Sequence, residues 1–361
     1  MSNSKTDAAA ASIQHDFFYV GGEYVGPPDR QVMSGQMYVE VLTPCQVTRP
    51  YPLVFIHGTA QTATNWLKTP DGRPGWATIF AQMGYQVYVV DQPARGRSVW
   101  HAQVDGELGV VPVAVVERYF TATAQAPWPQ ACKHTQWPGT GRKGDPVFDA
   151  FYASQVAYVV DTANSQRLFQ AAGMALLDKM GEAILITHSQ SGPYGWLLAD
   201  ARPQRVKAVI AIEPQGPPVV NMSMQSAVKG DSPVQESPQK RRWGIADIPL
   251  TYDPILHENE ELAVVLNPAQ LPTGRLPGWL QQEPARQLVN LKAVPFLIVT
   301  GEASFHALYD HATHDYLQQA GVPVTHWYLE DFGLTGNGHM LMLERNSHDI
   351  AQLLHRWIAD L

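Results

Sequence analysis

The segment ILITHSQSG, residues 184–192, ends an apolar run and contains two serines, of which one could serve as a nucleophile. A serine is presented for attack when it lies on a sharp turn between a strand and a helix, flanked two positions away by small residues. Ser189 has Thr187 and Ser191 at these positions, although neither is glycine. Ser191 has Pro193 two positions later, and that ring would crowd the turn. The pattern therefore predicts Ser189 as the nucleophile.

Two further motifs supply groups that a serine nucleophile requires. The segment GNGHMLMLE, residues 336–344, puts His339 in a loop just before the last expected helix, where it could accept the serine proton. His57-Gly58-Thr59-Ala60 follows the first expected parallel strand. From there the backbone N–H of Thr59, together with that of Gln190, would point to an oxyanion developing on an acyl group.

The carboxylate that would orient His339 is left open by the motifs alone. Glu302 and Asp310 follow the expected strand at 294–301, and an acid at this position would precede the histidine in the usual chain order. Glu213, at the end of the preceding expected strand, is the alternative.

The elements that would position these residues alternate along the chain. Apolar runs predict buried strands of a mainly parallel sheet at 51–58, 85–91, 182–188, 206–213 and 294–301. The runs at 17–25 and 36–44 alternate in polarity and predict antiparallel strands at its edge. Helical patterns lie at 74–84, 148–181, 193–202, 310–321 and 341–361. Alternation of strands and helices predicts an α/β class fold with a doubly wound sheet.

We expect one domain over residues 17–361, preceded by a disordered segment at 1–16. Residues 99–145 and 216–291 are rich in Pro, Gly and Trp and too long for ordinary connections, so they are expected to form a cap over the site. Aromatic side chains in the insertions would give the substrate pocket apolar walls. The expected pocket residues are His57, His188, Trp137, Trp243 and Trp279.

The bulk composition excludes several classes of partner. A net charge of −8 offers no basic surface for nucleic acid. The chain shows neither a signal peptide nor a membrane span, which predicts a cytoplasmic protein without a membrane partner. Cys45 and Cys132 are expected to be unpaired. The insertions offer a surface through which two copies could associate as a homodimer.

Two local patterns suggest cofactors, but their contexts argue against both. Residues 139–144 match G-x-G-x-x-G, yet no buried strand precedes them, and Asp145-Pro146 better fits a helix start. His306, His311 and His314 lie near Asp310 and Asp315, but three convergent zinc ligands with supporting partners cannot be identified. We therefore expect no cofactor and no metal.

The motifs together carry a resemblance to a known family. THSQSG, IEPQGPP, RRWGIADIPLTYDP, VTGEAS and GHMLMLE, with DQPARGRS after the second parallel strand, resemble the α/β-hydrolase superfamily and, within it, the Alcaligenes-type serine esterases. The resemblance spans most of the chain from about residue 17. It implies a catalytic triad of Ser189, Glu213 and His339, and therefore favours Glu213 as the acid. Secreted members of that group use disulfides that two lone cysteines cannot supply, so secretion is not carried over.

These observations favour a serine hydrolase that cleaves a carboxylic ester or lactone with a largely apolar body through an acyl-enzyme. Two alternatives stay open. One is a non-hydrolytic enzyme of the same fold, such as a lyase, acyl transferase or cyclase. The other is a ligand-binding protein built on the same scaffold.

Overall fold

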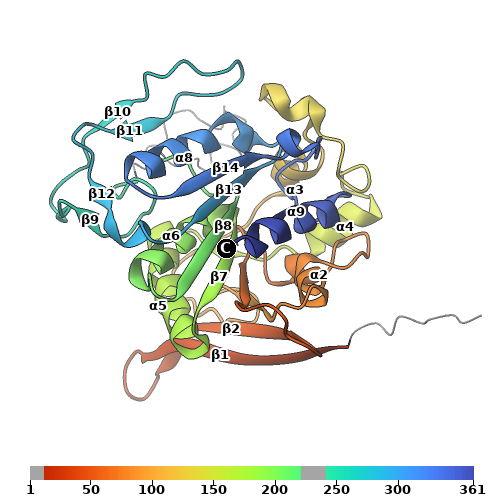
Figure 1. Ribbon diagram of the computed structural model, residues 1–361. Coiled ribbons are helices and arrows are strands. Elements are labelled where there is room, and N and C mark those ends of the chain that lie inside the picture. Colours follow the sequence, from red (N-terminus) through yellow and green to blue (C-terminus); the bar gives the residue numbers. More distant parts are fainter. Residues whose placement is uncertain (1–11, 221–240) are drawn as a thin grey trace, which may run out of the picture.

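The computed structural model describes residues 12–220 and 241–361, and a twisted sheet lies at their centre (Figure 1). Within these described residues the sheet has eight strands, in the order β1-β2-β4-β3-β7-β8-β13-β14. β1 and β2 pair antiparallel with each other, and β2 pairs antiparallel with β4, whereas the pairs from β4 to β14 are parallel. The strands are β1 (Ile13–Val25), β2 (Val32–Pro44), β3 (Leu53–Ile56), β4 (Val87–Asp91), β7 (Ala183–His188), β8 (Val206–Ile212), β13 (Phe296–Thr300) and β14 (Val324–Tyr328). The expected α/β fold with antiparallel N-terminal strands is confirmed.

Helices cover both faces of the sheet, and each face has its own apolar core. α2 (Trp76–Gln82) and α9 (Ser347–Ala359) pack on one face, while α5 (Thr162–Met180), α6 (Gly192–Ala201) and α8 (Asp310–Gln319) pack on the other. The buried strand β7 serves both, because its side chains alternate: Ile184 and Ile186 join the first core and Leu185 joins the second. This two-sided burial explains why the central strands are continuous apolar runs.

The single helix expected over 148–181 is two helices. α4 (Pro146–Ala153) ends early, β6 (Tyr158–Val159) follows, and only then does α5 begin. The Asp161 carboxylate accepts the Asn164 N–H and caps α5, as Asp145 caps α4 by accepting from Val147 and Phe148. β6 pairs with β5 (Leu108–Gly109), so the apolar residues before Asp161 belong to a short antiparallel bridge.

The two ends of the sheet differ from expectation as well. β1 begins at Ile13, so residues 12–16, expected to be disordered, are partly strand; residues 1–11 lie outside the described part. β14 was not predicted, because VTHWY is an edge strand with polar residues and lacks an apolar run. The last helix begins at Ser347, six residues later than its pattern suggested.

In their described residues, 99–145, 216–220 and 241–291, the insertions hold short elements. Residues 99–145 contain β5, α3 (Val113–Val116), a π-helical turn at Glu117–Thr121 and two 3-10 turns at Thr123–Gln125 and Pro129–Lys133. Residues 216–291 contain β9 (Tyr252–Asp253), β10 (Val264–Leu266), β11 (Trp279–Gln281), β12 (Gln287–Leu288) and a 3-10 turn at Val289–Leu291. Outside the insertions, the structure also contains α1 (Thr64–Leu67) and 3-10 turns at Ser189–Ser191, Phe305–Leu308 and Leu329–Phe332. In Figure 1 the β10–β11 hairpin extends near α8, away from α3.

Cys45 and Cys132 are free thiols, as expected. None of the helices in the described ranges combines the length and apolar character that a membrane crossing requires.

Candidate active site

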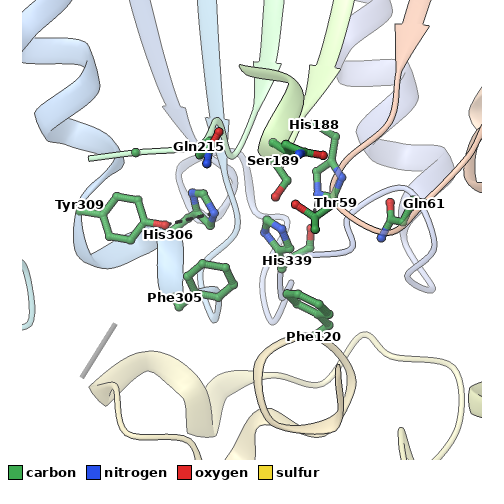
Figure 2. A pocket seen from close by; sticks show the side chains of 12 residues that line it. Thr59, Gln61, Phe120, His188, Ser189, Gln215, Phe305, His306, Tyr309 and His339 are labelled. Carbon is green, nitrogen blue, oxygen red and sulfur yellow. Dashed lines mark hydrogen bonds between the residues drawn. The ribbon is translucent and has the colours of Figure 1, made fainter. Parts of the chain in front are cut away.

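Ser189 occupies the turn between β7 and α6 with a backbone conformation that few residues adopt. Its φ is 53°, in the left-handed region, which is strained for a residue with a side chain. Gly192 permits this turn, because a Cβ there would lie 2.5 Å from Pro214 Cβ. Ser189 is partly exposed and lines a pocket, and Figure 2 shows its hydroxyl pointing toward the His339 ring.

Ser191, at the other end of the same 3-10 turn, has a different role. Its side chain is buried, its Oγ accepts the N–H of His188 at 2.8 Å, and its hydroxyl donates to the carbonyl of Ile56, also at 2.8 Å. These bonds fix the turn and tie it to β3. The structure thus gives the second serine a structural role and leaves Ser189 in the pocket.

Glu213 is the carboxylate that contacts His339. It follows β8 with a φ of 45° and is fully buried. Its Oε2 accepts from His339 Nδ1 at 2.5 Å and from Ser304 Oγ at 2.6 Å, while Oε1 accepts the Gly301 N–H at 2.8 Å. Of the two alternative acids, Glu302 pairs with Lys133 at 2.7 Å and Asp310 bonds His306.

Burial sets the protonation of this pair. Desolvation, followed by the nearby charges of His188 and His306, holds the pKa of His339 well below its ordinary value. The imidazole is therefore neutral at pH 7 and can accept a proton. Burial and then Asp310 raise the pKa of Glu213, an effect that the donors Ser304 and Gly301 oppose.

The loop that carries His339 is anchored by a buried carboxylate, that of Glu344, to which the sequence analysis gave no role although it ends the GNGHMLMLE motif. Glu344 accepts from the Gly338 N–H at 2.9 Å, from Asn337 Nδ2 at 2.7 Å and from His134 Nε2 at 2.7 Å. His134 belongs to the first insertion, so the insertion at 99–145 is fixed directly to this loop. His188 adds a bond from its Nε2 to the carbonyl of His339 at 3.0 Å.

A second histidine–carboxylate pair lies against the first. His306 Nδ1 donates to Asp310 Oδ1 at 2.8 Å, and its ring stacks on that of His339 with centroids 4.7 Å apart and planes 8° from parallel (Figure 2). Thr300 Oγ1 donates to the other oxygen of Asp310 at 2.7 Å. From the sequence, His306 was considered only as a possible metal ligand and was not placed in the pocket. Its signal was the i, i+4 spacing to Asp310 directly after a parallel strand.

Glu213, His306 and His339 form the one cluster among the described residues whose side chains could together bind a metal ion. Potential ligand atoms of Glu213, His306 and His339 lie within 4.8 Å of one another. Two nearly parallel imidazoles cannot both direct lone pairs at a single ion, and the Nδ1 atoms of both rings already donate to carboxylates. This geometry favours hydrogen-bonded acid–base pairs over a metal centre.

Thr59 and Gln190, the expected oxyanion-hole residues, both line the pocket with Ser189. The loop at Thr59 lies against Ser189 because the preceding residue, Gly58, has no side chain. A Cβ on Gly58 would lie 2.9 Å from His188 Nδ1 and 3.1 Å from Ser189 Cβ. A side chain at position 58 would therefore displace His188 or push the loop away from Ser189.

The pocket is small, about 50 Å³, and its walls are mixed. Phe120 from the first insertion and Phe305 provide apolar surface, and Figure 2 shows the segment with Phe120 across the pocket from the strand ends. The other lining residues are Gln61, His188, Gln215, Gly216, His306, Tyr309 and His339.

Of the five expected pocket residues, only His188 lines this space. His57 is fully buried behind the Gly58 loop, where its Nε2 accepts the Gln92 N–H at 3.1 Å. Trp137 packs against Phe151 in the first core, and Trp243 is buried in the second. Trp279 is half-buried in β11 and packs on the second core. The tryptophans stabilise the insertions against the body of the domain, since large apolar side chains gain most from burial there.

Comparison with known proteins places this architecture in a family. The family model described as "Alpha/beta hydrolase family" matches residues 53–353. The chain belongs to this family.

A curated relative named "Probable secreted lipase phiG", from Fungal sp. (strain ATCC 74256), is 44% identical over 350 residues, covering 97% of this chain and 90% of the relative. The solved structure titled "The Atomic Resolution Structure of a Novel Bacterial Esterase" has a TM-score of 0.66 at 24% identity, covering 99% of this chain and 98% of its own, a likeness in fold. The relative's name includes the word secreted, so the cytoplasmic location stays a prediction.

Proposed function

We propose that the protein is a serine hydrolase that cleaves carboxylic esters through an acyl-enzyme. One observation carries the proposal: Ser189, with its strained backbone, lines the same pocket as His339, whose ring is hydrogen-bonded to the buried Glu213. The 44% identical relative named as a lipase supports an ester substrate.

In this mechanism His339 removes the proton of Ser189 as the hydroxyl attacks the acyl carbon. The imidazolium then protonates the leaving alcohol, and water attacks the acyl-enzyme with His339 again as base. Glu213 holds Nδ1 protonated, leaves Nε2 as the basic atom and stabilises the cation. Three donors keep this carboxylate in position through both steps.

The negative charge on the acyl oxygen would be received by the N–H groups of Thr59 and Gln190. Each donor of this kind typically lowers the barrier by roughly 3–4 kcal/mol. The small volume of the pocket, about 50 Å³, favours an ester or lactone whose acyl part is compact where it meets Phe120 and Phe305.

Covalent labelling tests the proposal. A small fluorophosphonate should add one adduct to the parent and none to Ser189→Ala, as measured by intact mass. Ser191→Ala should still be labelled, with a lower melting temperature because the bonds to His188 and Ile56 are lost. Labelling that survives Ser189→Ala, or is absent from the folded parent, would overturn the proposal.

A second measurement separates hydrolysis from related chemistry. With an ester that is turned over in ¹⁸O-labelled water, a hydrolase incorporates the label into the acid product. An unlabelled product would instead indicate acyl transfer or lyase chemistry on the same fold.

A further inference from the structure

Arg95 is a buried cation that the triad does not use. It lies in the turn after β4, with its side chain almost fully buried, and it makes no salt bridge within the described part of the chain. Burial lowers its pKa to about 10, so the guanidinium still carries its charge at neutral pH. Burying a charge without an ion-pair partner destabilises the folded state, so a buried, unpaired arginine suggests a functional role.

The guanidinium contacts both segments that flank Ser189. Its Nη1 donates to the carbonyl oxygen of Gly58 at 3.0 Å, and its Nη2 donates to Gln190 Oε1 at 3.1 Å. Its Nε has no hydrogen-bond partner among the described residues. Arg95 thus joins the loop and the helix start that carry the two N–H groups assigned to the oxyanion.

His57 donates to the same carbonyl. Because His57 Nε2 accepts the Gln92 N–H, Nδ1 carries the ring proton and donates to Gly58 O at 3.0 Å. Burial, followed by the charge of Arg95, lowers the pKa of His57 to about 3, so the ring is neutral. The Gly58 carbonyl therefore accepts two donors, of which one is charged.

This carbonyl and the Thr59 N–H belong to one peptide unit. Donors on a peptide oxygen withdraw electron density from its nitrogen and make the N–H a stronger donor, as in a chain of cooperative hydrogen bonds. In a buried site the effect is not screened by water.

We propose that Arg95, supported by His57, is a positioning residue that polarises the Gly58–Thr59 peptide and thereby strengthens the oxyanion hole. The inference rests on the proposed serine chemistry. It adds to that site the charge of Arg95, which reaches the oxyanion hole through the Gly58 carbonyl.

The experiment compares Arg95→Met, Arg95→Lys and Arg97→Met with the parent in ester hydrolysis. Arg97 is the matched control: it lies in the same turn and pairs with Asp91 at 2.8 Å and Glu40 at 2.7 Å, without contacting the Gly58 loop. Arg95→Met should lower kcat about tenfold or more while KM changes little, a smaller loss than that of a direct oxyanion donor. Arg95→Lys should recover part of kcat, and Arg97→Met should lower the melting temperature while kcat is retained.

The binding affinities of two ketone inhibitors distinguish a loss of peptide polarisation from a loosening of the Gly58 loop. A trifluoromethyl ketone adds to the serine and forms an oxyanion, whereas the matching methyl ketone binds without that charge. Arg95→Met should weaken the first about as much as it lowers kcat and leave the second unchanged. Equal weakening of both, or an unchanged kcat in folded Arg95→Met, would overturn the inference. Absence of Ser189-dependent hydrolysis in the parent would overturn the proposed function and this inference together.

Discussion

Two histidine–carboxylate pairs lie side by side in this protein with their imidazole rings stacked. The two pairs have the same chemical groups and differ in their surroundings. His339 with Glu213 and His306 with Asp310 are all buried, with Nδ1–carboxylate distances of 2.5 and 2.8 Å. Of these two histidines, only His339 lies on the loop that Glu344 and His188 anchor beside Ser189. Figure 2 shows His339 between Ser189 and Phe120, with His306 on the side toward Tyr309. In the proposed mechanism, only the pair that its loop positions beside Ser189 acts as a general base.

The largest contrast is expected between the two histidines. His339→Gln should lower kcat at least about 10⁴-fold, because removal of a triad base abolishes proton transfer from serine. His306→Gln should cost less than about tenfold, since no step passes through it. Steady-state kinetics on one ester measure both. Equal losses of kcat in the two variants would show that both pairs take part in catalysis and would contradict this contrast.

Substitution of the two carboxylates should also cost more kcat in the Glu213 pair than in the Asp310 pair, with smaller losses than for the histidines. Glu213→Gln keeps the shape but lets the wrong imidazole tautomer form, and a loss of roughly 10³- to 10⁴-fold in kcat is expected. Asp310→Asn should leave kcat within about tenfold of the parent and act mainly on stability. The comparison fails if Asp310→Asn proves to be the more damaging change, as read from kcat and thermal melting together.

The hydroxyls that hold each carboxylate provide a finer test. Ser304 donates to Glu213 and Thr300 donates to Asp310, so Ser304→Ala and Thr300→Val remove equivalent bonds from the two pairs. Ser304→Ala should lower kcat by about tenfold, the lower end for supporting partners of a site. Thr300→Val should lower the melting temperature without a matching loss of kcat. A loss of kcat confined to Thr300→Val would reverse the assignment.

The smallest expected effect is a shift in the pH profile. His339 works as a base only when neutral, so activity is lost as the pH falls through its pKa, which burial and the neighbouring His188 and His306 hold below 6.5. The parent should therefore stay active below pH 6.5. His306→Gln removes one of these neighbours and should move the acid limb of kcat/KM to higher pH. A shift to lower pH would show that His306 stabilises the imidazolium.

Much of the fold followed from pattern because the central strands are buried on both faces. β14 and the break before α5 did not, since an edge strand lacks an apolar run and a two-residue bridge carries no periodicity. The positions of Ser189 and His339 in one pocket could be predicted from motifs at strand and helix ends. The choice of Glu213 over Glu302 could not be made from spacing, because it depends on which carboxylate the chain folds onto His339.

The tryptophans show the other limit of sequence reasoning. Trp137, Trp243 and Trp279 were expected in the pocket because they lie in insertions, yet they pack into the cores. Composition cannot distinguish an apolar wall from an apolar anchor. Phe120, a less conspicuous residue of the same insertion as Trp137, reaches the pocket instead.

Trapping the acyl-enzyme tests the central claim most directly. A chromogenic short-chain ester is mixed with the parent and with His339→Gln, quenched with acid within one turnover, and the protein is digested and analysed by mass. The account predicts that the acyl mass appears in the parent on the peptide that contains Ser189, and that the His339→Gln variant carries little of it in the same time. Turnover of the ester with no acyl group on Ser189, or with the group on another residue, would contradict it.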